Sequence, residues 1–323
     1  MAFATVRKLE GLRWEPCCVA HLGCVKSCLD YLGVGITRAW LYGGTGHAFV
    51  LNSQQGPCVS APTAWNTRML LDLAPNLGYR VEGIKVGRTE AGADFPRRQR
   101  EAWDFVRASI DRGIPCYGWQ LAVPDLYLIT GYDGLGYYYA GWAADDGAGH
   151  LPWEKLGTWD VDVLEVYAVS PCAPADDVKV VRDALAAAIR HAEDPGDWIL
   201  PGYTSGPAGF GLWADALEAG TAIANSSAYN ADFWGECREM AVEFLCEAKS
   251  RLPGRCDGAL DAAAGHYAVV RDRLRSLKAL HPELPEWDWE TPLTSAEGAV
   301  LMREAEVADR AGLECLKQIA ALA

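Results

Sequence analysis

Cysteine and histidine side chains gather near the start of the chain, at spacings that could support thiol chemistry. Cys17, Cys18, Cys24 and Cys28 fall within twelve residues, and His21 lies between them. A cysteine attacks as its thiolate, which a helix N-terminus or a neighbouring histidine favours. Because a helix is expected to begin close to Cys18, the side chains of Cys18 and Cys24 are candidate nucleophiles.

The same residues form a stripe on the expected helix, because positions 17, 21, 24 and 28 share one helical face. One interpretation is the buried face of a central helix, since free cysteines are often buried. The other is a thiol or metal site, in which Cys17, His21, Cys24 and Cys28 share a soft ion with a ligand from elsewhere in the chain. The sequence has no CxxC pair to support the metal interpretation, and no cofactor is expected.

His47 is a second candidate for catalysis. It lies in YGGTGHAFVLN, between a glycine-rich turn and an apolar segment that is typical of a strand. Such turns place side chains at the edge of a cleft and allow close approach of a ligand. His47 could act as the base for Cys18 or Cys24, with Tyr42 and Gly46 beside a ligand. The alternative is a histidine that packs beneath the loop.

The first half of the chain is predicted to be a helix-first α+β domain with an antiparallel sheet. The segment YDGLGYY is expected to join two of its strands as a hairpin. Helical patterns cover residues 18–32, 63–78 and 96–113, and strand-like patterns cover 47–52, 79–86, 115–122, 126–133, 136–142 and 164–170.

The second half is predicted to be an all-α helical bundle. It follows the linker PCAPADD, and the pattern divides the chain into domains 1–172 and 173–323. Ser205 is the expected N-cap of one helix, and Thr294 with Glu297 is the expected capping box of another. Helical patterns cover residues 177–194, 205–220, 230–252, 257–280 and 294–323.

Several phrases of the first half resemble the papain-like cysteine peptidase superfamily: EPCCVAHLGCVKSCLDYLG, GGTGHAF, RGIPCYGWQL and LITGYDGLGYYY. The resemblance covers roughly residues 14–170 and is to the branch of bacteriocin-leader-type peptidases and the N-terminal-like domains of butirosin biosynthesis protein H. The latter look like acyltransferases that act on carrier-protein thioesters, and a helical region often follows them. The resemblance implies a papain-like fold with a cysteine at the start of the first long helix and a histidine on a later strand.

The chain departs from the pattern of this superfamily at each catalytic position. The usual nucleophile lies 13 residues before the glycine that ends the first helix, and this count leads from Gly33 to Ala20. The position of the usual histidine holds Asp125, which cannot be a cationic partner for a thiolate. The usual acidic residue follows the next strand, where Asp145 and Asp146 are near but displaced.

Composition restricts the classes of partner that we expect the protein to bind and the cellular compartment in which we expect it. The net charge is −14, and most of the acidic excess follows Cys172, which argues against nucleic acid and anionic membranes as partners. No apolar run reaches the roughly 20 residues that span a bilayer. The start MAFATVRKLEGLRWEP lacks the apolar segment of a secretory signal, and the 11 cysteines are an odd number. We therefore expect a cytoplasmic chain with reduced thiols.

Three functions remain open. The first is a papain-like thiol enzyme with an atypical site, a hydrolase or an acyl or amide transferase acting on a small molecule or peptide. The second is a non-catalytic papain-like binding protein, and the third is a Cys/His metal or redox protein. The helical half is expected to shape the cleft or to build a homodimer interface. The residues expected to line a ligand pocket are Cys17, His21, Tyr42, Gly46, Trp119 and Tyr132.

Overall fold

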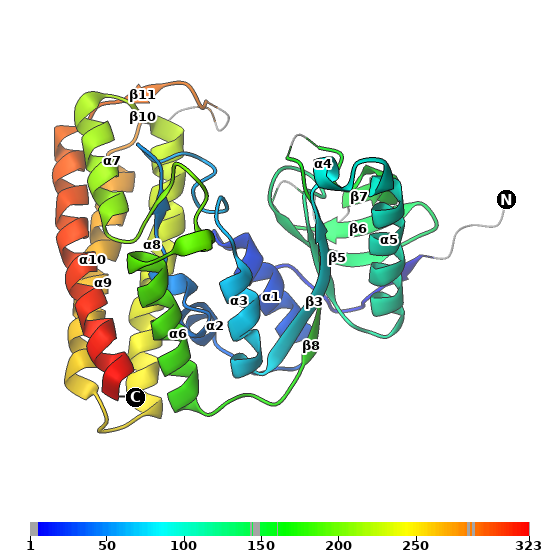
Figure 1. Ribbon diagram of the computed structural model, residues 1–323, viewed down its shortest axis with the longest axis horizontal. Helices are drawn as coiled ribbons and strands as arrows, with labels where there is room; N and C mark the ends of the chain where they lie inside the picture. The colour runs from blue at the N-terminus through cyan, green and yellow to red at the C-terminus, as the bar shows by residue number, and fades with distance from the viewer. Residues whose placement is uncertain are drawn as a thin grey trace. The chain divides into compact units, whose positions relative to one another are not determined.

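The chain folds as α+β, with helices and an antiparallel sheet, in two compact units (Figure 1). The computed structural model describes residues 6–142, 144, 149–159, 161–282, 285 and 288–322. One unit, here called the sheet unit, comprises Met1–Ile36 and Gly78–Pro174. The other, here called the helical unit, comprises Thr37–Leu77 and Ala175–Ala323. The chain therefore passes between the units three times.

The sheet unit contains an antiparallel sheet with the order β3-β8-β4-β5-β6-β7, and β1 also pairs with β5. The β5–β6 hairpin forms across the segment YDGLGYY, as predicted. β3 matches its predicted span, and the remaining predicted strands of this unit shift by a few residues at their ends. The strands are β1 Arg7–Lys8, β3 Tyr79–Val86, β4 Cys116–Trp119, β5 Leu126–Tyr132, β6 Gly136–Ala140, β7 Gly149–Pro152 and β8 Leu164–Pro171.

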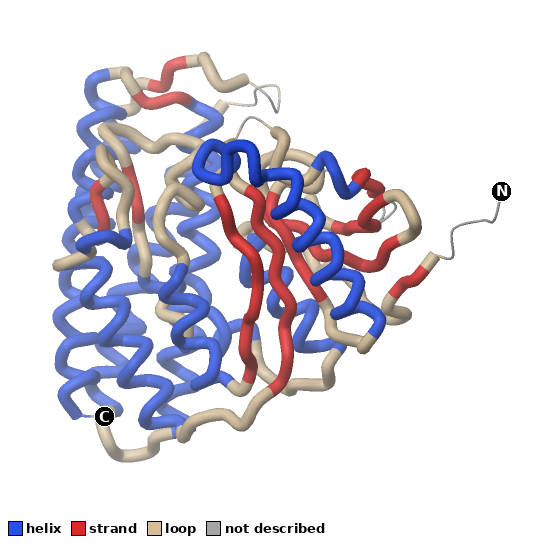
Figure 2. The backbone as a smooth tube through the Cα atoms, turned by 45° about the vertical axis from the view of Figure 1, so that its right-hand side comes forward, coloured by secondary structure: helices blue, strands red, loops and turns tan. Residues whose placement is uncertain are grey.

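Helices α1 (Ala20–Tyr31) and α5 (Phe95–Asp111) cover opposite faces of this sheet, with the short α4 (Arg88–Ala91) preceding α5. Adjacent residues of a strand point to opposite faces. Accordingly Tyr117 of β4 contacts His21 of α1, while Cys116 lies beside Ser109 of α5. Figure 2 shows a helix on each side of the strands. Helix α1 thus packs as a layer on the face of the sheet that includes β5.

The helical unit is built around three long helices, α8, α9 and α10, which lie side by side (Figure 1). Two short ladders, β2 with β9 and β10 with β11, connect its loops. Its helices are α2 Arg38–Gly44, α3 Arg68–Leu73, α6 Asp177–Glu193, α7 Ala208–Ala219, α8 Ala224–Arg251, α9 Asp257–Ala279 and α10 Ala296–Leu322, and its strands are β2 Asn52–Ser53, β9 Thr204–Ser205, β10 Ala222–Ile223 and β11 Pro292–Leu293.

Residues 37–77 belong to the helical unit, whereas the sequence assigns them to the first domain. Their main element is α2, whose glycines were expected to form a turn. A Cβ on Gly43 would lie 1.9 Å from Cγ of Phe244 on α8, so only glycine permits this approach. The other expected boundary, at 172/173, falls two residues before the passage at Pro174.

The segment HAFVLN was wrongly predicted as a strand. It forms a 3-10 turn at His47–Phe49, and only its last residue lies in β2. The buried guanidinium of Arg238 donates from Nη1 to the carbonyls of Ala48 and Val50, each at 2.9 Å. These carbonyls are therefore occupied by a side chain of α8 and not by a neighbouring strand.

Two predicted helix caps were also wrong. Ser205 lies in β9 opposite Asn52, and α7 begins three residues later. At the start of α10, the Oγ of Ser295 accepts the amide of Gly298 at 2.9 Å, so the cap is one residue beyond Thr294. The sequence pattern located both helices but placed the N-cap of each at the wrong residue.

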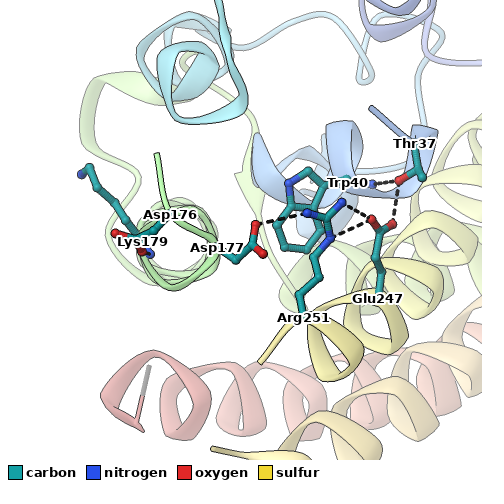
Figure 3. Close-up of polar contacts among 7 residues, drawn as sticks. All are labelled: Thr37, Trp40, Asp176, Asp177, Lys179, Glu247 and Arg251. Atoms are coloured by element: carbon teal, nitrogen blue, oxygen red, sulfur yellow. Dashed lines mark hydrogen bonds and ion pairs between the residues drawn. The ribbon is translucent and has the colours of Figure 1, made fainter. Parts of the chain in front are cut away.

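One polar network joins the two segments, at Thr37 and near Ala175, where the chain passes into the helical unit (Figure 3). Thr37 caps α2 by accepting the amide of Trp40 at 2.9 Å and donates to Glu247 at 2.6 Å. Arg251 donates to Glu247 and to Asp177 at the start of α6, and its guanidinium lies 4.0 Å from the centroid of the Trp40 ring. The starts of α2 and α6 are thus fixed to the same turns of α8.

Candidate functional site

The sheet unit brings thiols and a carboxyl group together where α1 and β5 begin. Cys17 and Cys18 precede Val19, the N-cap residue of α1, and Asp125 immediately precedes β5; all three side chains are half-buried. We call this group, with the buried Cys24, the α1–β5 site. Its position results from α1 lying directly on β5.

Asp125 has an unusual environment for a carboxyl group. Its Oδ1 accepts the amide of Leu126 at 2.8 Å, which favours the ionised form. Burial by surrounding protein atoms outweighs this bond and raises the pKa of Asp125 to about 7. Near neutral pH the group can therefore both accept and release a proton, which suits a general acid–base residue.

Cys24 interacts electrostatically with both Asp125 and Cys17 and is fully buried. Burial raises the pKa of Cys24 well above its usual value, and the nearby Cys28, Asp125 and Cys17 act in the same direction. Cys28 is buried as well, and its pKa is raised for the same main reason. Both thiols are therefore held in the protonated form, so burial opposes the role of nucleophile expected for Cys24.

Cys17 lies against the first turn of α1. Its sulfur donates to the carbonyl of Val19 at 3.3 Å, and a Cβ on Gly23 would lie 2.2 Å from that sulfur. Gly23 is thus required for this placement. Val19 occupies the N-cap position and carries no side-chain acceptor, so the positive end of the helix faces this region without a capping side chain. A helix N-terminus favours a thiolate, whereas the hydrogen bond from the Cys17 sulfur to the Val19 carbonyl favours the protonated thiol.

His21 does not take part in thiol activation in this arrangement. Its Nε2 is 3.0 Å from the hydroxyl of Tyr117, and its ring is buried. Burial, with a smaller effect of the Lys85 charge, lowers the pKa of His21 to about 4. The imidazole is therefore neutral at pH 7 and serves as a hydrogen-bonded core residue.

The proposed metal stripe finds no support in the structure. Within the described part of the chain, no group of three or more His, Cys, Asp or Glu side chains is placed to hold a metal ion. The 11 cysteines all lie in described segments, and no disulfide bond joins any two of them.

His47 belongs to the helical unit, and its thiol neighbour there was not anticipated. Its Nδ1 lies 3.5 Å from the sulfur of Cys237 on α8, and both residues are buried. The rings of Trp65 and Phe233 pack around it at centroid distances of 5.5 and 6.0 Å. The pairing of His47 with Cys18 or Cys24 stays a prediction.

The other two candidates near His47 have structural contacts. Tyr42 donates its hydroxyl to Glu236 of α8, and its ring meets the His47 ring edge-on. Gly46 has a φ of 75°, and a Cβ there would lie 3.1 Å from the carbonyl of Ala184. Gly46 is thus required by the backbone of the helical unit.

Trp119 lies opposite the first residue of β5, and Tyr132 is the last residue of that strand. Trp119 ends β4 and pairs with Leu126, so it adjoins Asp125. Tyr132 ends β5, about 20 Å away along a strand of 7 residues, and donates to Asp111 at 2.6 Å. The structure therefore groups Trp119 with the α1–β5 site and separates Tyr132 from it.

Gln120 joins the site without any sequence signal that could have indicated it. It is fully buried in the loop between β4 and β5, and its amide donates to the carbonyl of Asp125 at 2.8 Å. The expected acidic residues Asp145 and Asp146 lie outside the described residues.

Comparison with known proteins does not assign the chain to a family. No model of a known protein family matches it, and no curated protein matches its sequence. None of the described helices is both long and apolar enough to cross a membrane. The function is therefore inferred from the geometry of the α1–β5 site.

Proposed function

We propose that the sheet unit is a papain-like thiol enzyme that catalyses hydrolysis or acyl or amide transfer on a small molecule or peptide. The observation that carries the proposal is Asp125, a half-buried carboxyl group with a pKa of about 7 that lies close enough to Cys24 of α1 to influence the pKa of that thiol. It occupies the place where papain-like enzymes resembling this chain carry histidine. In this proposal a carboxylate replaces the imidazole as the base.

Cys17 is the proposed nucleophile. Its sulfur rests on the first turn of α1, and both Cys17 and Asp125 lie close enough to Cys24 to influence its pKa. Cys18 is the neighbouring thiol with which it must be compared. The backbone amides of the first turn of α1 supply the positive end of a helix dipole, which stabilises both a thiolate and a developing oxyanion.

The proposed reaction uses Asp125 for each proton transfer and passes through a thioester on Cys17. The Asp125 carboxylate accepts the proton of the Cys17 thiol as the sulfur attacks a carbonyl carbon and the carbonyl electron pair moves to oxygen. Collapse of this intermediate breaks the bond to the leaving group, which takes the proton from Asp125. Water or an amine then attacks the resulting thioester, with Asp125 again accepting a proton, and releases Cys17.

The pH dependence of thiol alkylation tests the proposal. In the intact protein, the rate at which iodoacetamide modifies Cys17 is expected to rise as the pH passes through about 7, because Asp125 accepts the thiol proton only when ionised. In Asp125→Asn this rise should move to about 8.5, the ordinary value for a thiol. Peptide mass spectrometry locates the modified residue.

Matched variants make the alkylation result specific. Cys17→Ser should abolish the alkylation whose rate rises near pH 7, and Cys18→Ser should retain it. The exposed Cys246 of α8 serves as an internal reference for thiol alkylation. An activated acyl ester should also leave an acyl group on Cys17. If the alkylation rate of no cysteine in the sheet unit rises near pH 7, and Asp125→Asn leaves the pH profile unchanged, the unit is a non-catalytic binding domain.

A further inference from the structure

Gln120 has a backbone conformation that its residue type disfavours. Its φ is 58°, and it is the sole non-glycine residue with a positive φ among the described parts of the chain. A glutamine side chain in the left-handed region crowds its own backbone, so this conformation persists only where surrounding contacts enforce it. Such residues concentrate at functional sites, and Gln120 lies within the loop that leads to Asp125.

Three hydrogen bonds enforce this conformation of the loop. The amide of Gln120 donates to the carbonyl of Asp125 at 2.8 Å, and its side-chain Nε2 donates to the carbonyl of Val161 at 3.0 Å. The amide of Asp125 donates to the carbonyl of Val123 at 2.7 Å. The loop is thus closed on itself and tethered to the segment that leads into β8.

A further contact fixes the loop to β5. The amide of Val123 donates to the hydroxyl of Tyr127 at 3.2 Å, and Tyr127 is the second residue of that strand. Among the described residues, the ionisable side chains of Cys24 in α1 and Tyr127 in β5 interact with Asp125. The position of the loop therefore decides how deeply the carboxyl group sits among them.

We propose that Gln120 is a positioning residue, which holds the Asp125 carboxyl group beside Cys24 through the tether to Val161 and the closed loop. The use of this position in catalysis rests on the proposed function above, but the tether itself does not. The side-chain Oε1 of Gln120 is buried without a hydrogen-bond partner among the described residues, so the side chain is held by its Nε2 alone. Loss of the Nε2 bond should release the loop.

Two substitutions distinguish the effect of the Nε2 hydrogen bond to Val161 from the effect of the strained φ of Gln120. Gln120→Gly adopts a positive φ without strain and removes the tether. Gln120→Met keeps most of the side-chain volume and lacks the donor. In both variants the Asp125 carboxyl group should become more exposed to water, so its pKa should fall from about 7 by at least about one unit towards the ordinary value. The alkylation profile of Cys17 should follow this shift.

Gln99→Ala is the matched control. Gln99 is another buried glutamine of the sheet unit, and its Nε2 donates to the carbonyls of Glu154 and Leu156 at 2.6 and 2.9 Å. It lies on α5, on the face of the sheet opposite α1. This control should lower the melting temperature without changing the titration of Asp125.

Carbon-13 NMR of protein labelled at its aspartate carboxyl groups measures the titration directly, with the Asp125 signal assigned by its loss in Asp125→Asn. An unchanged Asp125 midpoint in folded Gln120→Gly and Gln120→Met overturns the positioning role, even if alkylation still depends on Asp125. A shifted midpoint with no change in alkylation supports the positioning role and contradicts the proposed function. The two failures are therefore distinguishable.

Discussion

At the scale of single residues, the buried pair of Arg238 and Asp309 joins α8 to α10 within the helical unit. The Nε of Arg238 lies 2.9 Å from Oδ1 of Asp309, and both side chains are almost completely buried. The same guanidinium binds two carbonyls near His47, so one charged residue of α8 shapes the loop that follows α2. A buried charge is tolerated only because it is paired.

Removal of one partner should be costly. Asp309→Ala leaves the guanidinium uncompensated, and we expect the free energy of unfolding to fall by about 3–5 kcal/mol. Urea denaturation followed by circular dichroism measures this change. Asp261→Asn, which breaks the exposed pair with Lys249, should change stability by less than about 1 kcal/mol. Equal effects of the two variants would show that Arg238 finds another partner or water.

At the scale of elements, the packing of α2 on α8 explains why a glycine pair interrupts an otherwise apolar segment. A Cβ on Gly43 would overlap the Phe244 ring, and a Cβ on Gly44 would lie 2.5 Å from a methyl carbon of Leu77. The glycines were interpreted as a turn, but they allow two helices to approach closely. Glycine lowers the helix propensity of this segment but permits its close packing.

Gly43→Ala should destabilise the helical unit. The added methyl group has no space beside Phe244, and we expect a loss of about 2–3 kcal/mol from the forced separation of α2 and α8. Gly265→Ala is the control, because this exposed position within α9 has no atom within 4 Å of the added Cβ. That control should stabilise the protein by about 0.5–1 kcal/mol. A stabilising Gly43→Ala in thermal denaturation would contradict the close approach.

At the scale of the whole molecule, three buried groups give the two units different responses to acid. Burial, with a smaller effect of Arg238, lowers the pKa of His191 in the helical unit to about 4, and His21 in the sheet unit has a similar value. The unfolded chain protonates these histidines below about 6.5, so acid favours unfolding between about pH 6.5 and 4. Asp125 acts oppositely, because its folded pKa of about 7 exceeds the unfolded value.

We therefore expect the helical unit to lose more stability than the sheet unit between pH 7 and 5. In the sheet unit, the gain from protonating Asp125 offsets the loss at His21. Calorimetric scans at both pH values measure the two unfolding transitions. His191→Phe should reduce the acid loss of the helical unit, by an amount of order 2 kcal/mol, and Asp125→Asn should increase that of the sheet unit. A helical transition that is equally acid-sensitive in His191→Phe would contradict the assignment.

The sequence by itself determined the mixed class of the fold and most elements of the sheet and the bundle. Alternating residues such as those of 79–86 and amphipathic repeats such as 257–280 carry this information locally, because one face of each element must be buried. The same local information placed Cys17 before a helix and Asp125 before a strand.

Only the tertiary structure decided which of these residues meet. Residues 37–77 join the helical unit because α2 packs on α8. His47 therefore belongs to a different unit from the cysteines of α1. Burial by distant segments makes Cys24 and His21 inert, and it sets the unusual pKa of Asp125. Gln120 has a role only through Val161, 41 residues further along the chain. Desolvation and long-range contacts depend on the completed fold, so no local sequence pattern contains them.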